Sequence, residues 1–242
     1  MLPRPTLPDL PPLLLTRPAA ASARFAEAWH ATMGADAPVV VSPVVEIVPR
    51  PGAADLGGYA GLVFASENAV AALGPAPGPV VAWCVGARTA EAAAAAGYDA
   101  RSADGDAGAL VALVSASGTA GPLLFARGRE SRGDVAARLS EAGIRCEEAV
   151  VYDQRDAPLT PTALRLLAGT GAVLVPLFSI NSARRLAHAL RGEDVRARLR
   201  IVAMSPAVAE AWSGPSPAVL RVAGRPDGRA MIGALGALAA LP

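Results

Sequence analysis

The chain has few histidines and cysteines, two residue types that enzymes commonly use for acid–base, nucleophilic and metal chemistry. Its 242 residues include two histidines and two cysteines. His30 and His188 both fall in the middle of predicted helices, without a catalytic partner. Cys84 and Cys146 form no CxxC pattern, so they indicate neither a zinc site nor a disulfide scaffold, and we expect reduced core cysteines of a cytoplasmic protein. The sequence therefore predicts no metal site.

Other sequence signals of function are also missing. There is no GxxxxGK[ST] and no GxGxxG opening a helix, which disfavours nucleotide binding, and neither GxSxG nor HExxH occurs. The formal net charge of +1 gives no reason to expect nucleic acid or an anionic membrane as a partner. No uncharged run is long enough to span a bilayer. Met1–Pro8 lacks the apolar segment of a signal peptide, so we expect a cytoplasmic location.

What the chain does contain is a regular alternation of short apolar runs and helical segments. The clearest example is Leu62–Val70, where an apolar run ends at Ser66 and a helix-like stretch follows. Ser66 occupies an N-cap position, and Glu67 falls in the first helical turn, where an acid suits the helix dipole. Strands that alternate with helices predict an α/β fold with parallel sheets and right-handed crossovers.

The pattern also locates the individual elements. Strands are predicted at 13–18, 38–43, 61–65, 80–85, 98–102, 122–126, 172–176, 200–204 and 219–222, with another entering near Cys146. Helices are predicted around Phe25, Trp29 and Met33, at 68–73, 89–96, 107–115, 134–142, 161–168, 181–190 and 207–212, and from Gly228. The segments 44–52 and 149–154 are predicted to be extended.

Three segments of the chain have matching partners elsewhere in it. The matched pairs are Phe64–Val70 with Leu177–Ala183, Cys84–Ala92 with Ala203–Ala211, and Leu14–Pro18 with Leu124–Gly128. This repeat predicts two similar α/β halves, the first of which is interrupted by the whole of the second. We therefore predict a discontinuous first domain at 1–43 and 157–242 and an inserted second domain at 50–147. Residues 44–49 and 148–156 would be two connector strands.

All three matched motifs sit at predicted carboxyl ends of strands, the edge where open parallel sheets bind ligands. Two such edges facing each other across a hinge would form a cleft for one ligand. The predicted lining is Ser66, Asn68, Gly86, Thr89 and Arg127 on one side, and Arg17, Ser179, Asn181 and Ser205 on the other. Helix N-termini, hydroxyls and arginines suit an anion with several carboxylates or phosphates. The alternative for each serine is a simple helix cap, and for each arginine a surface residue.

Taken in order, the motifs resemble those of the uroporphyrinogen-III synthase family. The resemblance runs from Leu13 to the end of the chain and is carried by Leu15–Pro18, Phe64–Val70, Val85–Ala90, Arg127-Gly128 and Val151-Tyr152. It implies two flavodoxin-like, doubly wound parallel-sheet domains joined by a two-stranded connector. It places the active site in the interdomain cleft, with Gly128 among the substrate-binding residues and Tyr152 as the catalytic acid.

The resemblance also implies a substrate and a reaction. The substrate is hydroxymethylbilane, a linear tetrapyrrole with an acetate and a propionate on every ring. Loss of hydroxide gives an azafulvene, and closure through a spiro intermediate inverts ring D to form uroporphyrinogen III. No cofactor or metal is expected. Because the substrate cyclises uncatalysed to the wrong isomer, the main task would be to hold it in one geometry.

The family resemblance bears on partners and on two unusual positions. It implies a monomer that takes its substrate in a transient hand-over from the upstream hydroxymethylbilane synthase. Ala65 stands where the family usually has threonine, and Val208 replaces the threonine of a Gly-x-x-Thr pattern. Each loses a hydroxyl, and at Val208 this removes an expected polar contact. Tyr152 has an alternative as a packed connector residue.

Two other functions stay open from the residues alone. A non-catalytic, bilobal α/β protein that closes on a small polyanion is equally supported by the repeat and the predicted cleft. A nucleotide-dependent Rossmann enzyme is disfavoured by the missing glycine fingerprint.

Overall fold

The computed structural model of the protein describes residues 10–52, 54–119, 121–130 and 134–242. These residues form two compact units. One unit contains the described residues up to Glu46 together with Asp156–Pro242, and the other contains the described part of Ile47–Arg155. The segment Met1–Pro8, discussed above, lies outside the described residues. Within them, no helix is long and apolar enough to cross a membrane.

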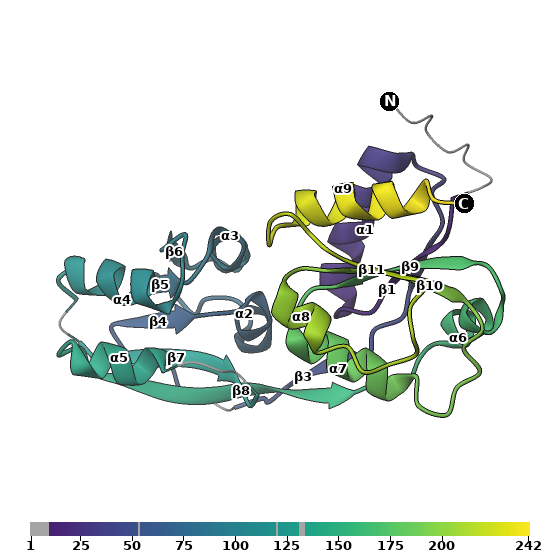
Figure 1. Cartoon of the computed structure of the whole chain (residues 1–242). Coiled ribbons are helices and arrows are strands. Elements are labelled where there is room, and N and C mark those ends of the chain that lie inside the picture. Colours follow the sequence, from purple (N-terminus) through teal and green to yellow (C-terminus); the bar gives the residue numbers. More distant parts are fainter. Residues whose placement is uncertain (1–9, 53, 120, 131–133) are drawn as a thin grey trace. The chain divides into compact units, whose positions relative to one another are not determined.

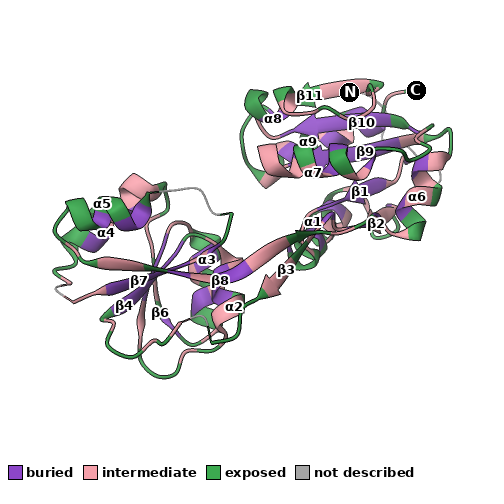
Figure 2. Ribbon diagram, turned by 90° about the horizontal axis from the view of Figure 1, so that it is seen from below, coloured by how far each residue is buried: buried purple, intermediate pink, exposed green. Residues whose placement is uncertain are grey.

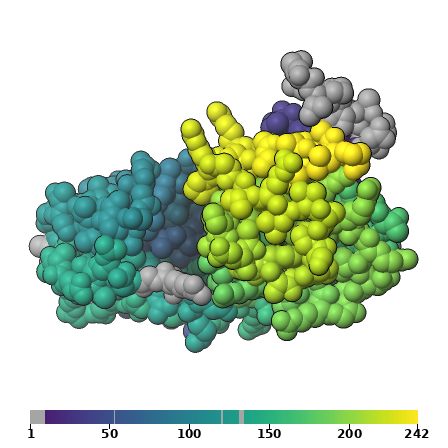
Figure 3. Space-filling view, in the orientation of Figure 1, coloured from purple at the N-terminus to yellow at the C-terminus, as the bar shows by residue number. Residues whose placement is uncertain are grey.

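The first unit is built on a five-stranded sheet of parallel strands in the order β11-β10-β9-β1-β2 (Figure 1). Its elements are β1 (Leu13–Leu15), α1 (Ala19–Met33), β2 (Val39–Val41), α6 (Pro161–Ala168), β9 (Ala172–Leu177), α7 (Ile180–Ala189), β10 (Arg198–Ala203), α8 (Pro206–Glu210), β11 (Val219–Val222) and α9 (Gly228–Ala239). On the face seen in Figure 3, residues from the last third of the chain, green to yellow, form most of this unit's surface.

Both faces of this sheet are covered by apolar helices, because successive strand residues point to opposite sides. Leu14 packs in one cluster with residues of α6, α7 and α8. Leu13 and Leu15 pack in another with residues of α1 and α9. Phe25 and Trp29 of α1 are both buried, which confirms that these aromatic residues belong to the core. Figure 2 shows the buried residues concentrated along the strands.

Helices α6 to α9 begin within one residue of the predicted positions, because each has an N-cap side chain that accepts a hydrogen bond from the backbone of the first turn. The Oγ1 of Thr160 accepts a hydrogen bond from the backbone N of Ala163 at 3.3 Å, and Pro161 occupies the first turn of α6. Ser179 and Ser182 form a reciprocal capping box at the start of α7.

The second unit contains a six-stranded sheet in the order β3-β8-β7-β4-β5-β6 (Figure 1). Its elements are β3 (Val45–Pro49), β4 (Gly61–Phe64), α2 (Glu67–Leu73), β5 (Val81–Cys84), α3 (Ala87–Ala95), β6 (Asp99–Ser102), α4 (Ala107–Ala116), β7 (Leu123–Gly128), α5 (Val135–Glu141) and β8 (Cys146–Asp156). The pairings from β8 through to β6 are all parallel.

One boundary in this unit differs from the prediction. The sequence suggests a strand entering near Cys146 and a separate extended segment at 149–154. The structure has a single strand of 11 residues, β8, which pairs with β7 along one side. Its other neighbour is β3. The backbone N of Arg50 donates to the carbonyl of Val151 at 2.8 Å, and that of Ala157 donates to Val44 at 3.1 Å, so these two segments run in opposite directions.

The internal repeat is confirmed as a repeat in space. Listed from matching ends, the first sheet is β2-β1-β9-β10-β11, and the second, apart from its extra strand β3, is β8-β7-β4-β5-β6. The three sequence matches therefore fall at equivalent places: at β1 and β7, after β9 and β4, and after β10 and β5. The helices follow the same equivalence, since α1 and α9 share one core cluster and α5 and α4 share another. The equivalent strands differ in their order along the chain. In the first unit β1 precedes β9, whereas in the second unit β4, the equivalent of β9, precedes β7, the equivalent of β1. The prediction of an α/β fold with parallel sheets is confirmed.

Candidate functional site

Each sheet has one point where the chain connections leave in opposite directions. In the first unit it lies between β1 and β9, because α1 leads from β1 to β2 and α7 leads from β9 to β10. In the second unit it lies between β4 and β7. Ligands of open α/β sheets bind outside the carboxyl ends of strands at such points. We call them the first edge, which includes Arg17 and Ser179, and the second edge, which includes Ser66 and Gly128.

The second edge includes the capped start of α2. Ser66 directly precedes the helix, and its Oγ accepts a hydrogen bond from the backbone N of Asn68 at 3.2 Å. Both side chains are half-buried, so each keeps some surface at the edge. The cap interpretation of Ser66 is therefore confirmed, and the role of Ser66 and Asn68 in binding a ligand stays a prediction.

Gly86 and Thr89 occupy the start of α3, beside this edge. A Cβ placed on Gly86 would have no atom within 4 Å, so the glycine leaves open space at the start of the helix. Thr89 is 8% exposed, and its backbone N donates to the carbonyl of Gly86 at 3.0 Å. The Thr89 side chain thus belongs mainly to the packed interior and offers little surface to a ligand.

The tightest packing at the second edge joins Gly128 of β7 to Tyr152 of β8. The two residues are partners in the parallel ladder, just after a register shift between Arg127 and Gly128. A Cβ on Gly128 would lie 2.5 Å from Cζ of Tyr152 and 2.8 Å from its hydroxyl oxygen. The phenol ring therefore lies directly against the glycine, and the missing side chain of Gly128 sets where the ring can lie. Tyr152 itself is 4% exposed and packs in the core cluster of this unit.

Arg127 already has partners within the second unit. Its Nε donates to Oε2 of Glu148 at 2.7 Å, and its Nη1 donates to the carbonyl of Gly128 at 3.1 Å. The guanidinium thus joins β7 to β8 as one half of a balanced ion pair. Its predicted role as a ligand-binding cation stays untested, but these contacts reduce the donors that it could offer.

A second charged cluster at this edge was missed by the sequence reasoning. Asp153 accepts a hydrogen bond from Nε of Arg129 at 2.6 Å, and its other oxygen lies 3.8 Å from Nε of Arg50. The hydrogen bond from Arg129 lowers the pKa of Asp153, with smaller contributions from the charges of Arg129, Arg50 and Arg155. Arg129 and Asp153 directly follow the motifs Arg127-Gly128 and Val151-Tyr152, which was the available signal. Arg50 could be placed here only from the pairing of β3 with β8.

The first edge is built from two helix starts and one stacked arginine. The guanidinium of Arg17 lies 4.4 Å from the ring centre of Phe178, which contacts Phe25 edge to face. The Oγ of Ser179 accepts from the backbone N of Ser182 at 3.1 Å. Asn181 follows in the first turn of α7 and is half-buried. Arg17 and Ser179 thus lie after neighbouring strands, as the sequence predicts, and their ligand contacts stay predictions.

The equivalent of the Gly86–Thr89 turn in the first unit is Ser205–Val208. The Oγ of Ser205 accepts from the backbone N of Val208 at 3.4 Å, which caps α8. Val208 is 5% exposed and packs in a core cluster. The absence of a hydroxyl at Val208 was expected to remove a polar contact, but the side chain lies in the interior, as that of Thr89 does. Substitution here changes core packing more than it changes a ligand surface.

One polar group at the first edge lacks a partner. Thr16 is 2% exposed, and its buried Oγ1 has no hydrogen-bond partner among the described residues. It directly precedes Arg17, in the motif Leu15–Pro18 singled out above. Sequence reasoning could not identify this atom, because its isolation depends on the packing around it.

The described residues offer no obvious conventional catalytic or metal centre elsewhere. Within them, no group of three or more His, Cys, Asp or Glu residues could hold a metal ion. Burial raises the pKa of the Cys84 and Cys146 thiols to about 11, so both are protonated at neutral pH and are poor nucleophiles.

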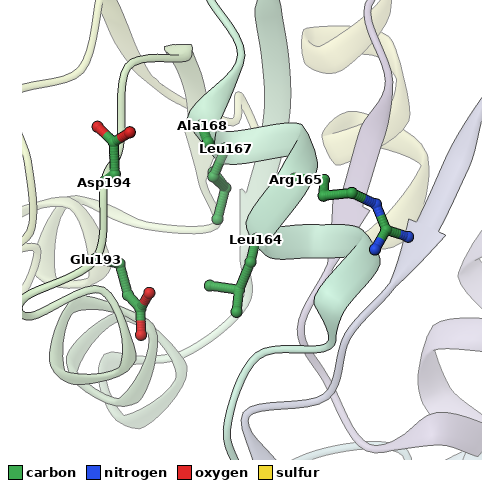
Figure 4. Close-up of a pocket in the computed structure, with 6 residues that line it drawn as sticks. All are labelled: Leu164, Arg165, Leu167, Ala168, Glu193 and Asp194. Carbon is green, nitrogen blue, oxygen red and sulfur yellow. The ribbon is translucent and has the colours of Figure 1, made fainter.

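A pocket of about 270 Å³ lies in the first unit between α6 and the segment before β10 (Figure 4). It lies at the amino end of β10, so it is at the opposite end of the strands from the first edge. Glu193 and Asp194 line it, and Figure 4 shows Arg165 pointing away from them. Two carboxylates on an apolar floor are unsuited to a polyanion, so this pocket does not compete with the strand edges as the predicted site.

Comparison with known proteins gives one family and a structural likeness. The model of the family described as uroporphyrinogen-III synthase HemD matches residues 29–233. The chain is similar to the crystal structure of uroporphyrinogen-III synthetase from Helicobacter pylori, with 16% identity, a TM-score of 0.63, and coverage of 95% of this chain and 99% of that one. It is also similar to a mutant uroporphyrinogen III synthase from Thermus thermophilus, with 17% identity, a TM-score of 0.47, and coverage of 94% and 98%. No curated protein sequence matches the chain. The first likeness shows a shared fold.

The contact between Gly128 and Tyr152 predicts a specific loss of stability. Gly128→Ala should lower the free energy of unfolding by about 1–3 kcal/mol, because the new methyl group overlaps the phenol ring. In a Tyr152→Ala background the same change should cost less than about 0.5 kcal/mol, since the ring is gone. Urea unfolding measures all four combinations. Gly78→Ala, where a Cβ meets nothing within 4 Å, is the matched control. Equal costs for the two glycine changes in the wild-type background would contradict the contact.

Proposed function

Because the chain belongs to the uroporphyrinogen-III synthase family, we propose that it cyclises hydroxymethylbilane to uroporphyrinogen III and inverts ring D as the ring closes. The observation that carries this conclusion is the family match over residues 29–233. The reaction is a step of tetrapyrrole and haem biosynthesis. It removes a hydroxyl and forms a carbon–carbon bond, so the enzyme is a cyclising, dehydrating carbon–oxygen lyase that works without a cofactor. The alternative, a binding protein without chemistry, is not favoured.

We propose that both units are flavodoxin-like domains. The first unit's strands, numbered in chain order, follow 2-1-3-4-5, which is the flavodoxin order. Apart from its extra strand β3, the sheet of the second unit has the same spatial arrangement with a permuted chain order, which supports the same fold for both units. The domains would comprise 1–43 with 157–242 and 50–147. Residues 44–49 and 148–156 would be the connector strands, and the pairing of β3 with β8 supports this.

We propose that the substrate's carboxylates bind at both edges. Helix starts present backbone N–H groups with a partial positive charge, and a carboxylate is a suitable acceptor for them. Serine or glycine N-caps precede four of these helices, so no bulky side chain blocks the approach. The proposed binding residues are Ser66, Asn68, Gly86, Thr89, Arg127 and Gly128 in the second unit, and Arg17, Ser179, Asn181 and Ser205 in the first.

Tyr152 is our candidate for the acid that assists departure of the hydroxyl. A phenol is a weak acid at neutral pH, so its contribution is small beside that of holding the substrate in one geometry. The packing of its ring against Gly128 supports the role, because it fixes the phenol at the carboxyl end of β7. An acid held in one place can donate to a leaving group that is itself held in place by bound carboxylates.

We further propose that the chain acts as a monomer in the cytoplasm. Cys84 and Cys146 are both free thiols, which supports a reducing compartment. The substrate is unstable and cyclises spontaneously, so a transient hand-over from the upstream hydroxymethylbilane synthase would limit formation of the wrong isomer.

The experiment that tests the function uses freshly generated hydroxymethylbilane and separates the product isomers. The chain should yield mainly the type III isomer, whereas the substrate alone yields the symmetric type I isomer. Type I as the sole product, with the protein folded, would refute the proposal. Retention of the tetrapyrrole without turnover would instead support the binding protein.

The proposed role of Tyr152 predicts a change in rate without loss of the fold. Tyr152→Phe should lower kcat by about tenfold to a hundredfold, because the proton donor is removed and the ring is kept. Tyr98→Phe is the matched control: its hydroxyl donates to the carbonyl of Gly74 at 3.1 Å in the same core cluster. That change should cost about 1 kcal/mol of stability and leave kcat unaltered. If Tyr152→Phe keeps full kcat, Tyr152 has no part in the chemistry.

A further inference from the structure

We propose that Arg129 and Arg50, aligned by Asp153, bind a carboxylate of the substrate at the second edge, and that Asp153 is a positioning residue for this pair. This inference rests on the proposed function, which supplies a substrate rich in carboxylates. It adds three residues to the second edge that neither the motifs nor the family resemblance identifies.

The backbone holds Arg129, Asp153 and Arg50 at the same strand ends as Gly128 and Tyr152. Arg129 directly follows Gly128, and its backbone N donates to the carbonyl of Tyr152 at 3.0 Å. Asp153 directly follows Tyr152, and the backbone of Arg50 pairs with Val151 at 2.8 Å. Each member of the cluster is therefore tied by the sheet to the residues that hold the phenol ring. Because successive strand residues point to opposite faces, Asp153 and the two arginines that contact it lie on the face opposite to the Tyr152 ring, at the same carboxyl edge of the sheet.

The cluster of Asp153, Arg129 and Arg50 carries more positive than negative charge. Asp153 contacts two guanidinium groups, at 2.6 Å for Arg129 and 3.8 Å for Arg50, so the three residues carry a net charge of +1. The neighbouring pair of Arg127 and Glu148 is neutral. Of the two adjacent clusters, the one centred on Asp153 has the unbalanced positive charge that an anionic side chain requires.

The two arginine side chains of the cluster are more exposed than the carboxylate between them. The side chains of Arg129 and Arg50 are 59% and 42% exposed, whereas that of Asp153 is 25% exposed. Both arginines approach Asp153 through Nε, so their terminal Nη groups are not used in these contacts. Asp153 is thus less exposed than the two arginines that contact it. The terminal N–H groups of these arginines are available to a planar carboxylate, which suits bidentate binding.

Asp153 restricts the conformations of the arginine side chains before a ligand binds. A long, exposed arginine side chain has many rotamers, and binding a ligand would normally require ordering it. The ion pair with Asp153 orders Arg129 in advance, and this lowers the cost of binding. Removing the negative charge raises the net positive charge of the cluster but releases both arginines. Positioning and simple attraction therefore predict opposite effects of Asp153→Asn on substrate affinity.

The test is steady-state kinetics with hydroxymethylbilane on the full chain, with the product isomers separated. Arg129→Gln and Arg50→Gln should each raise KM by about tenfold, because a charge-assisted hydrogen bond is lost, and should change kcat by less than about twofold. Arg145→Gln is the matched control, since this arginine is 76% exposed and pairs with Glu147 at the opposite end of the same strand. Its KM should stay at the wild-type value.

Asp153→Asn should raise KM severalfold, and Asp153→Glu should restore much of the affinity by keeping a carboxylate. An unchanged or lowered KM in Asp153→Asn would overturn the positioning role, and unchanged KM values in both arginine variants would overturn the binding site. These results are distinct from failure of the proposed function, which would appear as an absence of type III product from the wild-type chain.

Discussion

Parallel pairing at the centre of each sheet, β4 with β7 and β1 with β9, sets where the two strand edges lie. Parallel neighbours lie about 4.8 Å apart and end at the same edge, so the residues after them are brought together whatever their distance along the chain. Ser66 and Gly128 are joined in this way in the second unit, and Arg17 and Ser179 in the first. Because helices leave such a point in opposite directions, nothing in the connections covers it. The two units reach this arrangement with different chain orders, which indicates that the arrangement itself is what the repeat preserves.

The chemistry that these edges offer is binding and orientation more than proton transfer. With two histidines in the chain and two thiols whose pKa values are raised by burial, few groups can act as strong acids, bases or nucleophiles. Capped helix starts, a stacked arginine and arginines shared around one carboxylate are all suited to anions. A substrate that cyclises without help needs its reactive ends directed to one geometry, and fixing several carboxylates achieves that without a cofactor. In the proposed mechanism, Tyr152 lowers only a small share of the barrier.

Much of the fold could be predicted from the sequence because its signals are local. The caps at Ser66, Thr160 and Ser179 use residues within three positions of the helix start, and the buried strands are continuous apolar runs. The internal repeat extended this to the topology, since equivalent motifs had to occupy equivalent strand ends. Contacts that the sequence does not indicate depend on partners far away in the chain. The ligand-binding role of Arg127 stays a prediction, and its pairing with Glu148 follows only from the register of β7 and β8. The cluster at Asp153 likewise needs the pairing of β3 with β8, and the burial of Val208 needs the core around it.

We propose that carboxylates of the tetrapyrrole bind at the carboxyl edges of the sheets. The most direct measurement is a crystal structure of the chain with bound uroporphyrinogen III. Product carboxylates should lie within hydrogen-bonding distance of the helix starts at Ser66 and Ser179, with a pyrrole ring against Tyr152. A tetrapyrrole bound at the amino side of either sheet, as in the pocket beside Leu164 and Asp194, would contradict it.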